Sequence, residues 1–472
     1  MFKKVIPDET ETAVDTGRRF FMKSIARAVI AGGLALTLAA CTSSDADPEE
    51  SPPSAAPATP AGPELETTTV KALPGTEEAP FDQPRELQAP PGWTVSVWAR
   101  VPSARLLAWT PDNRVLVSRP KFGDVIELVP GEGDAAPTQR PLIEGLNQPH
   151  GLAFHGSTLY VAESDQIDAF TYGNGKLSGK KVVVEDLPDA KSSDLKGAYA
   201  HALKSVAVSK DGRQLYISVG STGNISAEDR DSDPERATIL TAPAAGGDPT
   251  TFARGVRNGT GLAIDPDGGV WTAVNHRDNL QYPHKTDIDG DGSPDNGDVI
   301  QEYVNDHPLE PLAKLTQGRD LGWPYCNPDP DLKPGEKDSP LGYTKRPLVN
   351  DDELNPDGSK LDCASLAPAE QGMGAHSAPL GLSFADVGGD YGPGALVGVH
   401  GSWNRKPPRP PEVSFFPWRN GTLDAQQTLL TGFQLEDGSR WGRPVMAIAG
   451  SDKAIYVSDD AAGAVYRVTP ST

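Results

Sequence analysis

The stretch YAHALKSVAVSKDGRQLYISVGSTGN, residues 199–224, decides the fold. Its apolar residues alternate at Val206 and Val208, reach an Asp-Gly turn, and alternate again in LYISV at 215–219. Apolar residues at every second position on both sides of a tight turn predict a β-hairpin. His201 therefore stands at the entrance of a hairpin.

The same pattern of strand, tight polar turn and strand occurs six times. The copies are LAW 107–109 with VLV 115–117, GLAF 151–154 with LYV 159–161, SVAV 205–208 with LYI 215–217, GLAI 261–264 with VWT 270–272, GLSF 381–384 with LVG 396–398, and AIA 447–449 with IYV 455–457. Most copies are separated by about the length of one four-stranded propeller blade. Six copies predict an all-β fold, a six-bladed β-propeller over residues 91–472. Separate sandwich domains are the alternative, but they would not explain one motif that recurs six times.

The interval between the fourth and fifth copies is about twice as long as the others. Its residues are rich in Pro, Gly and Asp, so we expect a long loop-rich insertion at 281–375. Cys326 and Cys363 lie in this interval and are the only cysteines of the predicted propeller. In an exported protein these two thiols are expected to form a disulfide.

The composition limits the partners of the protein. The chain has 472 residues, and its 43 Lys and Arg against 65 Asp and Glu give a formal charge of −22. Such a charge is repelled by nucleic acid and by an anionic membrane surface, so neither is an expected partner. The 49 Gly and 45 Pro fit many short strands and turns better than long helices.

The N-terminus has the features of an export signal over residues 1–40. Twin arginines at 18–19 precede FFMK and an apolar run that ends in LAAC at 38–41, which resembles a bacterial lipobox. Cleavage before Cys41 and lipidation of its sulfur would anchor the protein outside the cytoplasmic membrane. An ordinary signal peptide with an incidental Cys41 is the alternative. Residues 41–90 are rich in Ser, Pro, Ala and acidic residues and are expected to form a disordered tether.

Polar residues precede the first strand of five of the copies. They are NQPH at 147–150, His201, RN at 257–258, HS at 376–377 and RP at 443–444. Equivalent positions of successive blades converge on one mouth of a propeller channel. A ring of basic and imidazole groups there suits an anionic, planar, oxidised cofactor together with a base that abstracts a proton.

Several motifs in these loops resemble those of the soluble quinoprotein sugar dehydrogenases, particularly the L-sorbosone dehydrogenase-like and aldose dehydrogenase branch that uses pyrroloquinoline quinone (PQQ). The motifs are GVRN 255–258 followed by GLA 261–263, VNHRD 274–278, GWPY 322–325, HSAPLG 376–381, HGSWNR 400–405 and GRPV 442–445. Their order and their positions relative to the repeats make the resemblance fairly specific.

The resemblance implies roles for individual residues. It places the catalytic base on His201, the quinone contacts on Arg257 and Asn258, and a contact to a cofactor carboxylate on Arg443. Arg405 and Gln148 are looser matches to further cofactor residues. His201, an imidazole with an ordinary pKa near neutrality, would remove a proton from a sugar hydroxyl while hydride moves to PQQ, and Arg257 would stabilise the developing oxyanion.

The implied partners are a small sugar and an external electron acceptor, because the chain has no Cys-x-x-Cys-His haem motif. It also has no phosphate loop of the kind that binds a nicotinamide cofactor. Two positions depart from the family pattern: Ala200 replaces an acidic residue before the base, and Trp441 replaces a second cofactor arginine. A non-catalytic propeller lipoprotein that binds a carbohydrate or a protein is therefore the alternative function, and a calcium-dependent propeller hydrolase is a third.

An acidic stretch in the predicted insertion follows the spacing of a calcium-binding loop. Carboxylates occupy positions one, three, five, nine and twelve, with glycine at six; they are Asp287, Asp289, Asp291, Asp295 and Asp298. A plain acidic turn is the alternative. The resemblance implies another Ca²⁺ that bridges the cofactor, bound by backbone carbonyls near Asn275 and His276 with Asp278 nearby.

Overall fold

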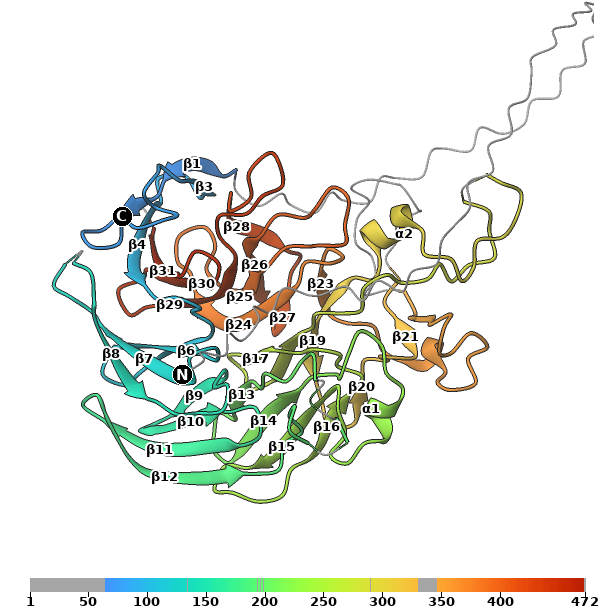
Figure 1. Cartoon of the computed structure of the whole chain (residues 1–472), viewed down its shortest axis with the longest axis horizontal. Coiled ribbons are helices and arrows are strands. Elements are labelled where there is room, and N and C mark those ends of the chain that lie inside the picture. Colours follow the sequence, from blue (N-terminus) through green and yellow to red (C-terminus); the bar gives the residue numbers. More distant parts are fainter. Residues whose placement is uncertain are drawn as a thin grey trace, which may run out of the picture. The chain divides into compact units, whose positions relative to one another are not determined.

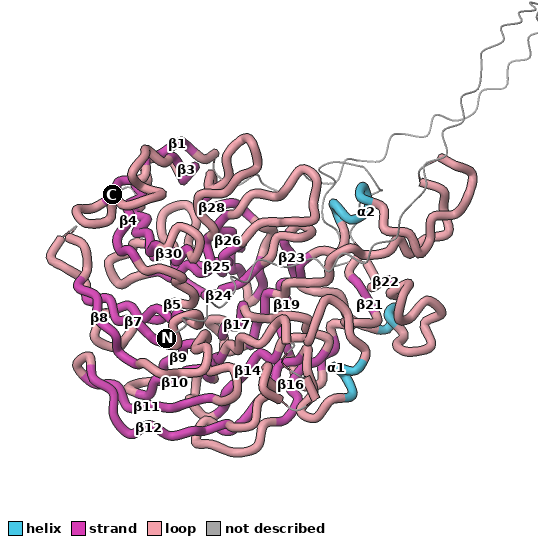
Figure 2. Tube along the Cα trace, viewed as in Figure 1, coloured by secondary structure: helices cyan, strands magenta, loops and turns pink. Residues whose placement is uncertain are grey.

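The structure is a computed structural model that describes residues 64–470, except 134, 193, 196, 198, 289 and 330–345. Strands and loops make up nearly all of this part of the chain, as Figure 2 shows. Its α-helices are the short α1 (Glu228–Asp231) and α2 (Gln301–Asp306). The all-β prediction is confirmed. The predicted signal at 1–40, Cys41 and the first part of the predicted tether lie outside the described residues.

Five sheets each take their four main strands from one run of the chain. The first contains β5 (Leu107–Trp109), β6 (Val115–Arg119), β7 (Asp124–Val129) and β8 (Thr138–Ile143). The second contains β9 (Leu152–His155), β10 (Thr158–Ala162), β11 (Ile167–Gly173) and β12 (Lys176–Val184). The third contains β13 (Val206–Val208), β14 (Gln214–Val219), β15 (Thr238–Pro243) and β16 (Thr250–Arg254). The fourth contains β17 (Gly261–Ile264), β18 (Val270–Ala273), β19 (Glu310–Leu315) and β23 (Gln371–Met373), and the fifth β24 (Pro379–Asp386), β25 (Pro393–Val399), β26 (Glu412–Arg419) and β28 (Gln427–Thr431).

A closing sheet joins the two ends of the folded chain. It contains β29 (Pro444–Ala449), β30 (Ile455–Asp459) and β31 (Ala464–Thr469). Beside β31 lies β4 (Thr94–Arg100), antiparallel from Ala464 opposite Arg100 to Thr469 opposite Thr94, with one register shift between Val465 and Tyr466. The prediction of six blades is therefore corrected to five: five blades come from single runs of the chain, whereas the last sequence copy forms a closing sheet that needs β4.

The sheets form a ring (Figure 1). The first strands of successive sheets contact one another in the order β5, β9, β13, β17, β24 and β29, and β29 contacts β5 again. Closure of a ring of antiparallel sheets leaves only short, protected edges and defines a β-propeller. The predicted propeller is confirmed.

Glycines in the repeat allow the first strands to approach closely. A Cβ on Gly151 would lie 2.6 Å from the backbone nitrogen of Val206 in the next sheet. A Cβ on Gly261 would lie 2.9 Å from the carbonyl oxygen of Leu380. Only glycine permits such close contacts between backbones. The glycine at the first position of these copies therefore allows the first strands of neighbouring sheets to lie close together.

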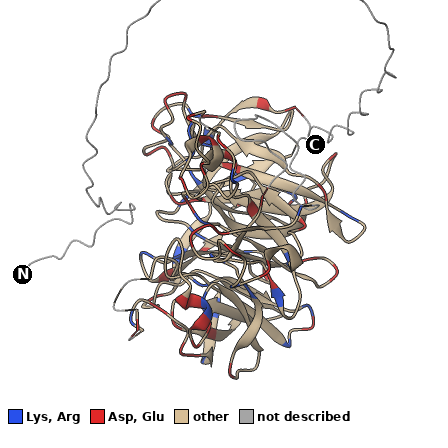
Figure 3. Cartoon of the chain, turned by 90° about the vertical axis from the view of Figure 1, so that its right-hand side faces the viewer, with Lys and Arg blue, Asp and Glu red and all other residues tan. Residues whose placement is uncertain are grey.

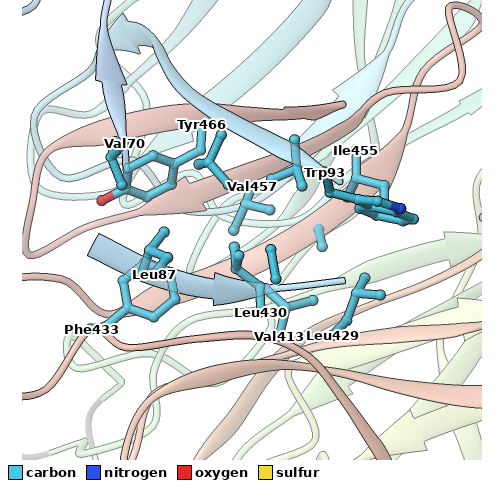
Figure 4. Close-up of a cluster of buried hydrophobic side chains, with 14 of the residues drawn as sticks. Val70, Leu87, Trp93, Val413, Leu429, Leu430, Phe433, Ile455, Val457 and Tyr466 are labelled. Carbon is cyan, nitrogen blue, oxygen red and sulfur yellow. The ribbon is translucent and has the colours of Figure 1, made fainter. Parts of the chain in front are cut away.

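Residues 64–90 are folded, which corrects the prediction of a tether up to residue 90. β1 (Glu66–Thr69) pairs with β3 (Glu86–Ala89), and β3 continues the fifth sheet because Gln88 lies opposite Thr431. β2 (Lys71–Ala72) pairs with β4. Val70, Leu87 and Trp93 pack with residues of β28, β30 and β31, as the cluster in Figure 4 shows.

The predicted insertion at 281–375 is also corrected. It contains two strands of the fourth sheet, β19 and β23, so that the extra residues form two segments, at 274–309 and 316–370. The second segment contributes β20 (Arg319–Asp320), which pairs with β16, and a small ribbon of β21 (Cys326–Asn327) and β22 (Val349–Asn350). No helix among the described residues has the length and apolar character needed to cross a bilayer.

Cys326 and Cys363 form the predicted disulfide, with a Cα to Cα distance of 5.5 Å. Both side chains are buried. The bond closes a loop with a sequence separation of 37.

Replacing both cysteines with alanine is expected to lower the free energy of unfolding by about 3 to 4 kcal/mol, because the open chain gains conformational entropy in the unfolded state. Denaturant titration monitored by tryptophan fluorescence measures the change, with wild type in reducing buffer as the matched control. Equal unfolding midpoints for wild type and the double variant would contradict a stabilising role for the bond.

Candidate active site

The starts of the first strands and the ends of the second strands lie on one face of the ring, because the two strands of each pair are antiparallel. We call the loops at these ends the mouth. Side chains that precede first strands there are Arg105, His150, His201, Arg257, His376 and Arg443. Side chains that follow second strands are Ser221, Asn275, His400 and Asp460. In the view of Figure 3, acidic and basic residues are interspersed along the coloured part of the chain.

Ser221 holds the ring of His201 in one orientation. His201 Nδ1 lies 2.9 Å from Ser221 Oγ and 3.1 Å from Ser221 O. The carbonyl oxygen can only accept a hydrogen bond, and the Ser221 hydroxyl donates its own hydrogen to Gly223 O at 2.7 Å. Nδ1 must therefore carry the hydrogen, and Nε2 keeps a lone pair that can accept a proton.

This contact orients the imidazole, the task that the resemblance would give to an acidic residue at the position of Ala200. Ala200 is exposed, and Ser221 takes over the orientation of the imidazole. Lys204 holds the loop that carries His201. This lysine is fully buried, and its Nζ donates a hydrogen bond to Ala202 O at 2.6 Å. The sequence signal for Ser221 was weak, because it is one of several small polar residues after the second strand.

Burial, with a smaller contribution from the charge of Arg257, lowers the pKa of His201 to about 3. This corrects the expectation of a pKa near neutrality. The imidazole is therefore neutral, and ready to accept a proton, throughout the physiological pH range.

The acid limb of kcat/KM is accordingly expected well below the ordinary imidazole pKa of about 6.5. A base must be unprotonated to work, so activity should remain level from about pH 8 down to about pH 4. A pH profile of sugar oxidation measures this. A tenfold loss per pH unit that begins near pH 6.5 and persists in Glu310→Gln would contradict the assignment of His201 as the base. Burial also raises the pKa of Glu310 to about 7, so a limb near pH 7 that disappears in Glu310→Gln belongs to Glu310.

Arg257 is buried beside His201 and is held by backbone and side-chain oxygens. Its Nε donates to Asn224 O at 3.0 Å, and its two terminal nitrogens donate to Asn275 O at 3.2 Å and Asn224 Oδ1 at 3.1 Å. Asp278 lies 3.8 Å away and pairs with its charge. The guanidinium is therefore a fixed cation in a desolvated place, where charge interactions are strong.

Asn258 lies close to His201 because Gly220, between them, has no side chain. A Cβ on Gly220 would lie 2.5 Å from the Cβ of His201 and 3.3 Å from Asn258 Oδ1. The predicted base and two predicted cofactor residues, His201, Arg257 and Asn258, thus come together as the sequence indicated.

Asn275 and His276, the expected backbone ligands of a cofactor-bound Ca²⁺, lie in the same cluster. Asn275 N donates to Asn258 O at 2.9 Å, and His276 N donates to Glu310 Oε2 at 2.5 Å. The His276 ring is buried and neither of its nitrogens has a hydrogen-bond partner. Glu310 was missed at the sequence level because β19 was taken for part of an insertion.

A second cluster lies around Arg443 on the same face. Its Nε donates to His400 O at 3.1 Å. Asp460 accepts from His400 Nε2 at 2.8 Å and from Arg105 at 2.8 Å. Arg105 and Asp460 were also missed, although both stand at repeat positions: Arg105 precedes the first strand of its copy, and Asp460 follows the second strand of the sixth.

The two looser matches differ in their surroundings. Arg405 donates to Asn305 O at 2.8 Å and lies 3.7 Å from Asp306, so its contacts are with α2 rather than with Arg257. Gln148 is half-buried in the left-handed region, with φ 50°, two residues before His150. The buried Nε2 of His150 has no hydrogen-bond partner.

Trp441, the second departure, belongs to the hydrophobic core. Its Nε1 donates to Gly432 O at 3.0 Å, and its ring lies edge-on to Phe81 at 6.1 Å. The neighbouring Arg440 donates to Ser402 O and, apart from burial, has its pKa lowered by the charge of Arg443. Arg440 and Arg105 are thus two further cations on the side of the mouth where the family pattern would place an arginine at 441.

The predicted calcium loop is a turn held by its own carboxylates. Asp287 accepts from Gly290 N at 2.6 Å and from Gly292 N at 2.8 Å. Asp291 accepts from Ser293 N, and Asp295, which is buried, from Ile288 N; Asp298 N donates to Asp295 O. Within the part of the chain that the structure describes, no three His, Cys, Asp or Glu side chains are grouped to hold a metal ion. Asp289 lies outside that part, so calcium binding by this loop stays a prediction.

The donors of the mouth suit a planar anion. They include three arginines, Arg105, Arg257 and Arg443, and the buried ring nitrogens of His150 and His276 that lack partners. Buried polar groups without partners cost free energy, which a ligand that completes their hydrogen bonds would recover. These cations and unsatisfied imidazoles, on the same face as the unprotonated His201 Nε2, therefore fit PQQ, an anion with three carboxylates.

The fold and the mouth define a β-propeller with a cationic, imidazole-lined site. The chain belongs to the TrAA12-like family, whose model matches residues 87–471. This agrees with the resemblance to soluble quinoprotein sugar dehydrogenases.

Two relatives illustrate the family. An uncharacterized protein of Borreliella burgdorferi is 24% identical over 340 residues, which cover 68% of this chain and 76% of that protein. The pyrroloquinoline quinone-dependent pyranose dehydrogenase of Coprinopsis cinerea is 24% identical over 405 residues, covering 70% of this chain and 53% of the relative. The chain thus spans about half the length of that enzyme.

Solved structures share the fold. The PQQ domain of the Coprinopsis cinerea pyranose dehydrogenase, in its holo form, has a TM-score of 0.67 at 19% identity, covering 85% of this chain and 100% of that one. A calcium structure of the Trichoderma reesei enzyme of carbohydrate-active family AA12 has a TM-score of 0.65 at 20% identity, covering 81% and 96%.

Proposed function

We propose that this protein is a PQQ-dependent dehydrogenase that oxidises a hydroxyl group of a sugar or sugar aldehyde. The observation that carries the proposal is the position of His201 beside the buried Arg257, with its Nε2 left free to accept a proton by the bond from Nδ1 to Ser221. Membership of a family with a PQQ-dependent pyranose dehydrogenase among its relatives supports it.

Each residue then has a chemical task. PQQ, when bound, supplies the two-electron acceptor for hydride. Arg257 and Asn258, together with Arg443 and Arg105, would hold it in the mouth. His201 Nε2 takes the hydroxyl proton of the sugar, and Ser221 keeps the imidazole in the required tautomer. The fixed guanidinium of Arg257 stabilises negative charge without reorganising, which is the basis of electrostatic catalysis.

We further propose where the protein acts and where it binds Ca²⁺. The features of residues 1–40 and Cys41 favour export by a twin-arginine signal and a lipid anchor, so that the enzyme acts outside the cytoplasm on a soluble sugar and passes electrons to an external acceptor. Ca²⁺ would bind beside the cofactor, near Asn275 and His276, and in the loop from Asp287 to Asp298.

Titration of the full chain with PQQ and Ca²⁺, followed by the absorption spectrum and a dye-reduction assay with pyranoses, other aldoses and sorbosone, tests the function. We expect stoichiometric PQQ binding and sugar-dependent dye reduction. Sugar binding without any PQQ binding would contradict the proposed dehydrogenase activity and favour the alternative function, a carbohydrate-binding lipoprotein.

A further inference from the structure

Trp403 is exposed on the loop that follows β25. Its exposed fraction is 58%, whereas the chain's other tryptophans are buried or half-buried. A single exposed apolar side chain is ordinary on a protein surface. The surroundings of Trp403 are what distinguish it.

The loop around Trp403 is anchored on both sides. Ser402 N donates to Arg409 O at 3.1 Å, and its hydroxyl accepts from Arg409 N at 2.6 Å. Asn404 O accepts from Gln301 of α2 at 3.0 Å. Ser402 and Asn404 are buried, so the indole projects from a fixed backbone rather than from a loose loop.

Residues near both ends of this loop contact side chains of the mouth. On one side, His400 contacts Asp460 and Arg443, as described above. On the other side, Asn404 Nδ2 donates to Asn279 Oδ1 at 3.4 Å. Asn279 adjoins Asp278, which pairs with Arg257. Hydrogen bonds and an ion pair therefore connect the loop that carries the indole to the cluster that contains the proposed base.

The residue that follows Trp403 carries a polar atom without a hydrogen-bond partner. Asn404 is 7% exposed, and its Oδ1 has no hydrogen-bond partner. A buried acceptor without a partner is unfavourable unless a ligand supplies a donor. An exposed aromatic face and, on the next residue, an unsatisfied amide oxygen are groups that suit a cyclic sugar, which has apolar C–H faces and hydroxyl donors at its edge.

We propose that Trp403 and Asn404 form the sugar-binding subsite of this enzyme, with the indole stacked on a face of a pyranose ring and Asn404 Oδ1 accepting from a ring hydroxyl. The proposal rests on the proposed function and specifies its substrate class. Stacking on an indole favours a closed ring with equatorial hydroxyls, because its C–H faces are continuous, over an open-chain polyol or aldehyde.

Kinetics on the reconstituted full chain test the subsite. Trp403→Ala is expected to raise KM for glucose about 5- to 10-fold and to change kcat less than twofold, because stacking binds the substrate and the transition state equally. Trp403→Phe should restore most of the loss, since it keeps an aromatic face. Asn404→Leu should also raise KM. Trp418→Phe, a half-buried tryptophan on β26, is the matched control and should leave KM unchanged.

A second measurement does not need the cofactor. Titration of the PQQ-free protein with methyl β-D-glucopyranoside should quench tryptophan fluorescence in wild type but not in Trp403→Ala, and sorbitol should quench weakly. Unchanged KM in Trp403→Ala, with dye reduction intact, would overturn the subsite and leave the proposed function standing. Trp403-dependent quenching in a protein that never binds PQQ would support the subsite and overturn the function. Absence of quenching by every sugar would overturn the subsite.

Discussion

Replacing His201 with asparagine is expected to lower the rate of sugar oxidation by about 10²- to 10⁴-fold, the usual effect of losing a positioned base. Asparagine can still donate a hydrogen bond from its amide to Ser221, as Nδ1 does now, but it has no basic nitrogen in place of Nε2. The variant therefore separates proton abstraction from the structural contact. Steady-state dye reduction at saturating PQQ and sugar measures the effect.

His155→Asn is the matched control for this prediction. His155 is exposed at the opposite end of β9 from the mouth, so its replacement should change neither stability nor turnover. If His201→Asn binds PQQ normally and turns over at the wild-type rate, His201 is not the base and its contact with Ser221 only secures a strand end.

Replacing Arg257 with lysine is expected to lower kcat by about 10²- to 10³-fold and to weaken PQQ binding as well. Removal of one preorganised donor at a developing anion typically costs that much. Lysine keeps the charge but lacks the planar fork, so it cannot contact Asn224 and Asn275 at once. A PQQ titration and a dye-reduction assay on the same preparation measure both effects.

Arg254→Lys is the matched control, because Arg254 is exposed on the outer strand β16 and pairs with Glu235 rather than with a side chain named in the mouth. It should behave as wild type. A wild-type kcat in Arg257→Lys would show that a point charge is sufficient and that the geometry of the guanidinium has no catalytic role.

The propeller could be predicted from the sequence because each hairpin is a local signal. Partners such as Val206 and Ile217 lie only 11 positions apart, on either side of a turn, and the alternation of apolar residues is visible in the sequence. The closing sheet could not be predicted in this way, since Ala464 pairs with Arg100 across nearly the whole chain. The strands at 66–89 were missed for the same reason: β1 is the short polar segment ETTT, and its place depends on partners far away in sequence.

The candidate site was predictable where a motif coincides with a repeat position. His201, Arg257 and Asn258 were found in this way, and the structure brings them together. Ser221 and Glu310 were not, because a lone serine after a strand and a glutamate in a misassigned segment have no distinctive spacing. The lowered pKa of His201 depends on burial and on the charge of Arg257, which only the folded chain brings close.

The most direct test of the central claim is the rate at which a sugar reduces bound PQQ in a single turnover, without an external acceptor, in wild type and in His201→Asn. The absorbance of the quinone in a stopped-flow instrument reports this rate, and prior titration establishes that both proteins are fully loaded. We expect equal PQQ affinities and a rate at least about 100-fold lower in His201→Asn. Equal rates in the two loaded proteins would contradict the assignment of His201 Nε2 as the proton acceptor.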